Sequence, residues 1–253
     1  MIHAILLLAL MAGNTVWEDF ANWFSREGKP GAPADVVRSY TVALQARGVS
    51  ESDAAARGKE VQEYLGAHPR EALTLHFNRI YTWKDAPFSR EPSAFVRRVA
   101  STRSPGRALD IAMGQGRNAV WLAKQGWQVS GYDISDAALR EANAAAAAAG
   151  LQLETTLASH EEYELGTARW DLIVMSFAFT RLSDQEYMKR VRNSLKPGGV
   201  LLVEGFNGGP SKELNLILKA VLEYRVLLFE DLPDVSDWGR MKAPLLRMAL
   251  ERP

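Results

Sequence analysis

Two carboxylates and two glycines have the spacing that a ribose-containing ligand requires. Asp110 ends a short apolar run, and Gly114 and Gly116 follow it. Glycines here let the backbone turn tightly and let a ligand approach more closely than any Cβ would permit. Asp133 ends the next apolar run, 19 residues after Gly114. An acid at about this distance holds two ribose hydroxyls in doubly wound sheets, so the stretch 106–135 predicts a nucleoside-type site.

The glycine spacing alone does not distinguish two classes of cofactor. Gly114-x-Gly116-x-x-Ala119 also satisfies the dinucleotide fingerprint, so an NAD-type site is one alternative. A plain tight turn with a capping acid is another. Asp110, four residues before Gly114, is the residue that discriminates. A carboxylate attracts a ligand that carries an ammonium group, whereas it repels the negative charge of a pyrophosphate. The sequence therefore favours S-adenosylmethionine over NAD.

Strands and helices that alternate from Arg107 onward would position these residues. Apolar runs typical of strands occur at 107–112, 127–132, 151–156, 170–175, 200–204, 224–229 and 244–250. Helical patterns occur between them, at 116–124, 136–149, 183–195 and 210–221. Strands that alternate with helices indicate a parallel sheet covered on both faces. No helix separates the last two strands, so we expect the last strand to run antiparallel to its partner.

The sequence before the sheet is helical. Apolar residues recur at helical spacing between residues 15 and 91, and Phe77, Ile80 and Tyr81 mark one apolar face. Such a face must be buried against something. We expect 15–91 to form a helical lid or cap beside the crevice, and 92–253 to form the sheet domain. A structural brace or a dimer contact is the alternative for these helices.

Residues 1–14 form a separate apolar N-terminal segment. The run MIHAILLLALMA, over residues 1–12, is too short to span a bilayer as a helix. It resembles the apolar region of a signal peptide, although no Lys or Arg precedes it. We expect the protein to be in the cytoplasm, because S-adenosylmethionine is made there. Export or membrane anchoring through residues 1–12 is the alternative, and contact with a membrane is expected only in that case.

Composition argues against several classes of function. Lys plus Arg and Asp plus Glu number 30 each, so the net charge gives no reason to expect a nucleic-acid partner. The chain contains no cysteine, which excludes disulfides, thiolate metal sites and cysteine nucleophiles. No pair among its four histidines has metal-ligand spacing. We therefore expect neither nucleic acid nor a metal ion as a partner, and the oligomeric state stays open.

The glycine-rich stretch has a family resemblance. Leu109–Asn118, LDIAMGQGRN, resembles motif I of class I S-adenosylmethionine-dependent methyltransferases, with Ala112 in place of the first glycine. The G-Q-G-R-N run is most similar to the tellurite-resistance and thiopurine-methyltransferase-like branch. Trp170–Ile173 resembles the family's fourth strand, and Leu195–Gly199 resembles the motif before its fifth. The resemblance covers residues 92–253 and implies a Rossmann-like, seven-stranded, doubly wound α/β sheet with an antiparallel last strand.

The resemblance also implies roles for individual residues. Asp110 and the Gly114–Gly116 turn would hold the methionine part of the cofactor, and Asp133 would bind the ribose hydroxyls. The loop after the third strand usually supplies an acid to the adenine amino group, and that position falls on Ser159, with His160 beside it. The full set of expected cofactor-binding residues is Asp110, Ala112, Gly114, Gly116, Asn118, Asp133, Ile134, Ser159, His160 and Ser176.

Methyl transfer from a sulfonium is an in-line displacement with a leaving group that is already activated. Catalysis therefore requires mainly alignment of the nucleophile and exclusion of water. No acid or base is indispensable, and the candidates for such a role are His160, Tyr81 and Glu204. No large insertion or basic surface indicates a polymer, so we expect methyl transfer to a small-molecule acceptor. An NAD-type oxidoreductase and a non-catalytic cofactor-binding protein are the alternatives.

Overall fold

The chain folds into two compact units. The computed structural model describes residues 15–86, 88–178, 182, 184–207 and 221–253. One unit extends to Lys84, and the other runs from Asp85 to Pro253. The boundary expected from the sequence lay slightly later, between residues 91 and 92.

Three sequence expectations concern residues outside this description. They are the apolar segment 1–14, the helix start at Ser183 and nearly all of the helix at 210–221. Within the described ranges, the helices are too short or too polar to cross a membrane.

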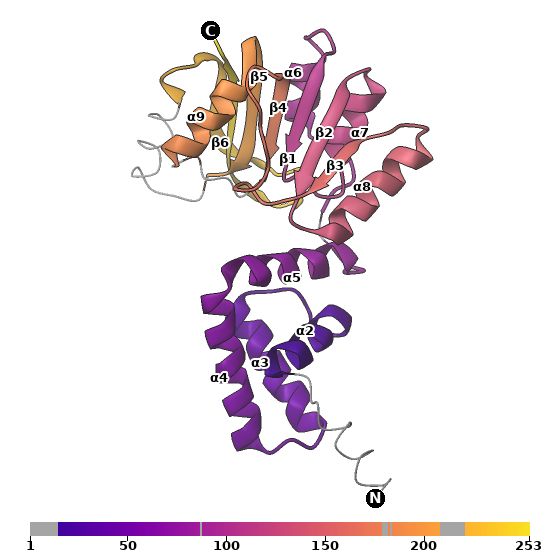
Figure 1. Cartoon of the computed structure of the whole chain (residues 1–253), viewed down its shortest axis with the longest axis vertical. Coiled ribbons are helices and arrows are strands. Elements are labelled where there is room, and N and C mark those ends of the chain that lie inside the picture. The colour runs from indigo at the N-terminus through magenta and orange to yellow at the C-terminus, as the bar shows by residue number, and fades with distance from the viewer. Residues whose placement is uncertain (1–14, 87, 179–181, 183, 208–220) are drawn as a thin grey trace, which may run out of the picture. The chain divides into compact units, whose positions relative to one another are not determined.

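The described residues of the N-terminal unit form four helices (Figure 1), namely α2 (Val16–Arg26), α3 (Pro33–Ala46), α4 (Glu51–Ala67) and α5 (Pro69–Thr82). Thr15 and Glu18 form a capping box at the start of α2, because the side chain of each accepts the backbone N–H of the other. The Oγ of Ser50 accepts the N–H of Asp53, which fixes the start of α4.

Aromatic residues form the core of this unit. Phe20, Trp23 and Phe24 of α2 are buried. They pack with Tyr40 of α3, whose ring meets Phe20 edge-on with 5.2 Å between the centroids. The helical spacing that the sequence indicated for these residues is therefore confirmed.

A buried arginine joins α5 to the end of α2. Arg79 is 8% exposed and donates to the carbonyls of Gly28 at 2.7 Å, Ser25 at 3.0 Å and Arg26 at 3.1 Å. The last carbonyls of a helix have no partner within that helix. The guanidinium therefore satisfies the C-terminal end of α2 and fixes α5 beside it.

We expect Arg79→Met to lower the free energy of unfolding of the N-terminal unit by about 2–4 kcal/mol, because three carbonyls lose their donor. Urea denaturation followed by tryptophan fluorescence would measure the change. Arg38→Met is the matched control, since Arg38 pairs with Asp35 on an exposed helix surface, where such a pair contributes at most about 1 kcal/mol. Equal losses for the two variants would contradict the role of Arg79.

The strands of the second unit form one seven-stranded sheet with the order β3-β2-β1-β4-β5-β7-β6. The strands are β1 (Arg107–Ile111), β2 (Gln128–Asp133), β3 (Glu154–Leu157), β4 (Trp170–Ser176), β5 (Leu195–Phe206), β6 (Arg225–Val235) and β7 (Lys242–Glu251). Strands β1 to β5 are parallel, and β7 runs antiparallel to both β5 and β6. The expected doubly wound sheet with an antiparallel last strand is therefore confirmed.

Helices cover both faces of the sheet (Figure 1). One face packs against α6 (Ala94–Ala100), α7 (Arg117–Lys124) and α8 (Asp136–Ala148), and the other packs against α9 (Gln185–Ser194). Successive side chains of a strand point to opposite faces. In β1, Ala108 belongs to the α7 side and Leu109 to the α9 side. The same alternation places Asp110 on the α7 side.

Strand β1 lies where the strand order reverses direction. Its neighbours are β2 on one side and β4 on the other, and both are parallel to it. Ligands of doubly wound sheets bind beyond the carboxyl ends of the strands at such a switch point. The fold therefore positions the residues after Ile111 at the expected ligand-binding edge.

Three strand boundaries differ from expectation. Strand β3 begins at Glu154 rather than at 151, because the N–H of Leu151 still closes the end of α8 on the carbonyl of Ala146. Strand β5 begins at Leu195 rather than at 200, because Leu195 already pairs with Trp170. Strands β6 and β7 pair as far as Val235 and Lys242, so their loop is much shorter than the gap between the expected strands at 224–229 and 244–250. In each case hydrogen bonding to a distant or adjoining segment decides the boundary.

Candidate cofactor and acceptor site

A turn with three left-handed residues joins β1 to α7. Ala112, Gly114 and Gly116 have φ angles of 50°, 54° and 75°, where a residue without a Cβ is favoured. A Cβ on Gly116 would also lie 2.8 Å from the Cβ of Ala142 in α8. Gly116 is therefore required both by its backbone and by the packing of α7 on α8. Ala112, which replaces the glycine of the motif, is left with a strained backbone.

The carboxylate of Asp110 is buried beside this turn. Asp110 is 2% exposed, and its Oδ2 has no hydrogen-bond partner among the described residues. Burial raises the pKa of this carboxyl to about 7, although Arg117 and the backbone N–H of Ala119 act to lower it. A buried acceptor without a donor costs free energy. The site is therefore suited to a ligand group that donates hydrogen bonds and carries positive charge.

Asp133 ties the end of β2 to the glycine turn. Its Oδ2 accepts the N–H of Gly114 at 2.8 Å, and its Oδ1 accepts the N–H of Ser135 at 2.9 Å. Burial raises the pKa of this carboxyl, and the hydrogen bonds from the backbone oppose that effect. A carboxylate offers about four lone-pair positions, so these two bonds leave acceptor capacity for hydroxyl groups.

Ile134 and Ser159 come to the same edge from the ends of β2 and β3. Ile134 is partly exposed. The N–H of Ala158 donates to the carbonyl of Asp133 at 3.0 Å, which fixes the loop after β3 beside β2. The N–H of Ser159 donates to the carboxylate of Glu162 at 3.0 Å. The acid that bonds Ser159 is therefore Glu162, three residues further along the loop, which the sequence count did not single out.

The ring of His160 joins a group of tyrosines in the core on the α9 side. Its Nδ1 lies 2.9 Å from the hydroxyl of Tyr132 and 3.4 Å from that of Tyr187. Tyr132 also stacks on Tyr163, with 4.3 Å between the ring centroids. Asp110 faces the α7 side, so the structure does not bring the His160 ring together with it.

Polar side chains of the G-Q-G-R-N run hold a backbone segment that we call the strap, residues 89–93. Each of three side chains bonds a different residue of the strap, at alternate positions. Gln115 donates to the carbonyl of Ser89 at 3.0 Å, Arg117 donates to the carbonyl of Glu91 at 3.0 Å, and the Oδ1 of Asn118 accepts the N–H of Ser93 at 2.9 Å. Asn118, which we expected at the cofactor, therefore contacts the strap.

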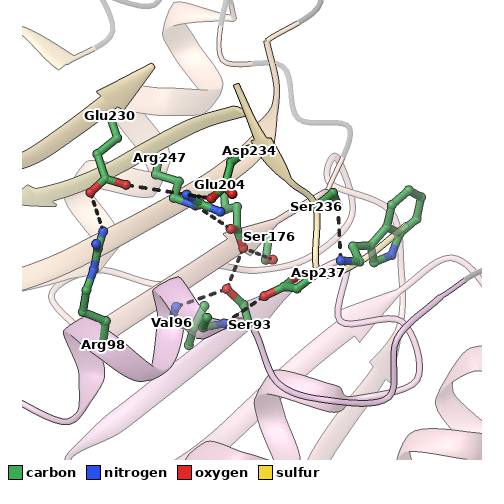
Figure 2. A network of polar contacts seen from close by, with 12 residues as sticks. Ser93, Val96, Arg98, Ser176, Glu204, Glu230, Asp234, Ser236, Asp237 and Arg247 are labelled. Carbon is green, nitrogen blue, oxygen red and sulfur yellow. Dashed lines mark hydrogen bonds and ion pairs between the residues drawn. The ribbon is translucent and has the colours of Figure 1, made fainter. Parts of the chain in front are cut away.

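Ser176 and Glu204 belong to a buried polar network, which Figure 2 shows. The Glu204 side chain is 1% exposed, and its Oε1 accepts a hydrogen bond from the Nε of Arg247 at 2.9 Å. Its Oε2 accepts hydrogen bonds from Ser93 at 2.6 Å and from Ser176 at 3.2 Å. Arg247 also pairs with Asp234 at 2.8 Å. Both oxygens of Glu204 are engaged, so its geometry is that of a structural carboxylate rather than of a base.

Arg117 and Asp237 were not found from the sequence. The Arg117 side chain is 6% exposed, pairs with Asp237 at 3.0 Å and lies 3.4 Å from the Oγ of Ser176. Asp237 also accepts the N–H of Ala94 at 2.8 Å. Arg117 and Asp237 lie 120 residues apart, and no local pattern links them. The remaining catalytic candidate, Tyr81, lies on α5 in the N-terminal unit.

Residues 108–199 match a family model described as a methyltransferase domain. The match lies within the sheet unit and extends from β1 to the start of β5. It confirms the methyltransferase resemblance of LDIAMGQGRN. Among the described residues, no group of His, Asp and Glu is arranged to hold a metal ion.

Curated relatives match part of the chain. It is 33% identical over 103 residues to the ribosomal RNA small subunit methyltransferase C of Alcanivorax borkumensis, over 38% of this chain and 31% of that protein. It is 29% identical over 149 residues to an uncharacterized protein of Mycobacterium tuberculosis, over 56% of this chain and 52% of that protein. The chain thus spans 31% and 52% of the length of these relatives.

Solved structures share the fold. TehB from Haemophilus influenzae superposes with a TM-score of 0.52 at 19% identity, over 64% of this chain and 62% of that chain. The 1,6-didemethyltoxoflavin-N1-methyltransferase of Burkholderia thailandensis, solved with S-adenosylhomocysteine, gives a TM-score of 0.55 at 19% identity. That match covers 76% of this chain and 89% of the other. At such identities the similarity concerns the fold.

We expect Asp110→Asn to stabilise the ligand-free protein more at pH 8 than at pH 5. Because the folded-state pKa is raised to about 7 from an ordinary 3.8, the stability that a protonated Asp110 contributes is lost as the pH rises through 7. Asparagine does not ionise and escapes this loss. Between these pH values the difference in the free energy of unfolding between variant and wild type should grow by roughly 2–3 kcal/mol.

Thermal unfolding of both proteins at each pH, without ligand, would measure this difference. Comparison of the two proteins at the same pH cancels contributions from other titrating groups. A difference that does not depend on pH would show that Asp110 titrates as an exposed carboxyl.

Proposed function

We propose that this protein transfers a methyl group from S-adenosylmethionine to a small-molecule acceptor. The observation that carries the proposal is the unpaired, buried Oδ2 of Asp110 beside the glycine turn. An ammonium group supplies the missing donor and the opposite charge, whereas a pyrophosphate would add negative charge. The free amino group of S-adenosylmethionine therefore fits this position, and a dinucleotide does not.

The neighbouring residues fit the rest of the cofactor. Asp133 would accept the ribose hydroxyls with the lone pairs that Gly114 and Ser135 do not use. Ile134 would offer an apolar contact to the adenine, and the loop at Ser159 would close the far side of that ring. Ala112 and the glycines would give backbone access to the methionine part.

The chain's own residues would contribute alignment and a dry environment rather than acid–base chemistry. S-adenosylmethionine, when bound, supplies a methyl group on a sulfonium that needs no further activation. Glu204 is bonded to Arg247 and Ser93, which argues against its use as a base. Ser176 already donates to Glu204 and lies near Arg117, so it would shape the end of β4 as a fixed hydroxyl. Proximity and orientation supply most of the required rate.

A small-molecule acceptor is favoured by the charge balance. The whole chain has equal numbers of basic and acidic residues. Arg117, at the carboxyl edge of the sheet, is already paired with Asp237. Binding of RNA requires cations that are available to neutralise phosphates. One partial relative is named as a ribosomal RNA methyltransferase. Methylation of RNA by this protein would therefore contradict the proposal.

We expect S-adenosylhomocysteine to raise the melting temperature, and NAD or NADP to leave it unchanged. A ligand at about 100 times its dissociation constant stabilises the folded state by roughly 2.7 kcal/mol.

Asp133→Asn should weaken binding of S-adenosylhomocysteine about 10- to 100-fold in calorimetry, because hydrogen bonds to a charged acceptor contribute roughly 1.5–3 kcal/mol. Asp136→Asn is the matched control, since Asp136 pairs with Arg140 on the surface of α8.

A shift with NAD alone would overturn the proposed cofactor. Tight binding of S-adenosylhomocysteine without turnover on small acceptors would indicate a non-catalytic binding protein. Transfer of radioactive methyl groups to RNA rather than to small acceptors would overturn the proposed acceptor class.

We further propose that the N-terminal helices act as a lid that excludes water from the reaction. Much of α5 is only partly buried, and its Leu73 is 50% exposed, so this helix has apolar surface to offer a partner. The strap residues bond the G-Q-G-R-N run, so a truncated chain should begin at Asp85, before the strap, rather than at Glu91.

A protein that begins at Asp85 should stay folded and bind S-adenosylhomocysteine within about threefold of the full chain, but lose at least about 90% of its transfer activity. Calorimetry and a radiometric assay measure the two quantities. Full activity would exclude a lid, and unfolding would favour a structural brace.

A further inference from the structure

Four aromatic rings from four separate segments stand together at the carboxyl edge of the sheet. We call them the ring wall, formed by Phe88, Phe177, Phe206 and Trp238. The Trp238 ring stacks on two others, with its centroid 4.2 Å from that of Phe88 and 5.3 Å from that of Phe177. None of the four belongs to either core cluster of the sheet, so the wall is separate from the packing that holds the sheet together.

The backbone fixes these rings beside the ends of β4 and β5. Phe177 directly follows Ser176, has a φ of 53° and donates its N–H to the carbonyl of Glu204 at 2.7 Å. A left-handed backbone at an aromatic residue persists only where the surroundings over-determine it, and such residues cluster at binding sites. The carbonyl of Trp238 accepts the N–H of Ser89 in the strap at 2.9 Å.

Phe206 is the ring of the wall with the most accessible surface. It ends β5, is 38% exposed and contacts Phe177 at 5.0 Å between centroids. Phe177, by contrast, is 8% exposed. A ligand at this edge would therefore meet the Phe206 ring, backed by the rest of the wall.

Charged side chains next to the wall are already paired with one another. Arg117 pairs with Asp237, one residue before Trp238, and Glu204 pairs with Arg247 behind Phe177. Recognition of an acceptor with a full charge would require breaking one of these buried pairs, which is costly. The edge thus offers ring surface and neutralised charge.

We propose that the methyl acceptor is an uncharged planar aromatic molecule that stacks against the ring wall at Phe206. This rests on the proposed methyl transfer and names its acceptor class. A hydroxyl or ring nitrogen of the acceptor forms the new bond to the methyl carbon while the methyl–sulfur bond breaks. The electron pair of that bond stays on sulfur as S-adenosylhomocysteine forms, and the acceptor's proton passes to water.

The test uses the full chain saturated with S-adenosylhomocysteine and titrated in a calorimeter with 2-naphthol, 6-hydroxyquinoline and 5-hydroxyindole. Each ring is paired with decahydro-2-naphthol, a saturated alcohol of similar size that is also uncharged. At least one ring should bind about three- to tenfold more tightly than this saturated alcohol, the range that ring stacking contributes beyond contact area. Phe206→Leu should abolish that preference and Phe206→Tyr should keep it.

Phe229→Leu is the matched control, because Phe229 is a similarly exposed phenylalanine, 44%, on β6 and outside the wall. It should keep the preference, and all variants should bind S-adenosylhomocysteine as the wild type does. Rings that bind no better than the saturated alcohol, or a preference that survives in Phe206→Leu, would overturn the ring wall as the acceptor site. Failure of the wild type to bind S-adenosylhomocysteine would instead overturn the proposed function.

Discussion

The hydrogen bond from the N–H of Gly114 to the carboxylate of Asp133 is the constraint on which the cofactor edge depends. It joins the end of β2 to the turn after β1, so that the two acids of the site belong to one rigid unit. Both Asp110 and Asp133 are buried, and burial raises the pKa of each. The ligand-free protein therefore carries two carboxylates in an environment that disfavours their charge. A cationic ligand with hydroxyl groups would offset the free-energy cost of burying these two charges.

The contacts around this turn extend outward in layers. The side chains of the G-Q-G-R-N run bond the strap, and Ser93 of the strap donates to Glu204 in β5. Glu204 bonds Arg247 of β7, and Asp237 in the β6–β7 turn returns to Arg117. The closed circuit links the first helix of the domain, the glycine turn and the final hairpin. The G-Q-G-R-N run, which has the pattern of a cofactor-binding motif, thus also positions the strap and the final hairpin at the carboxyl edge of the sheet.

Local patterns in the sequence were sufficient for the elements and their order. Short apolar runs specify β1 and β4, and glycines that adopt a positive φ specify the turn at Gly114 and Gly116. The absence of a helix between the last two strands indicated that β7 is antiparallel, as it is. These features depend on interactions within a few residues, and the residue types themselves contain that information.

The roles of individual side chains at the edge were decided by tertiary structure. The sequence alone determined that acids stand in β1 and at the end of β2, that a glycine turn follows β1 and that a helical segment precedes the sheet. It did not determine that Asn118 contacts the strap, that the His160 ring joins Tyr132, or that Glu204 is bonded at both oxygens. It also did not reveal the pairing of Arg117 with Asp237, or the assembly of Phe88, Phe177, Phe206 and Trp238 into one wall. These contacts join segments up to 150 residues apart, as between Phe88 and Trp238, and only the twist and register of the folded sheet determine which distant side chains meet.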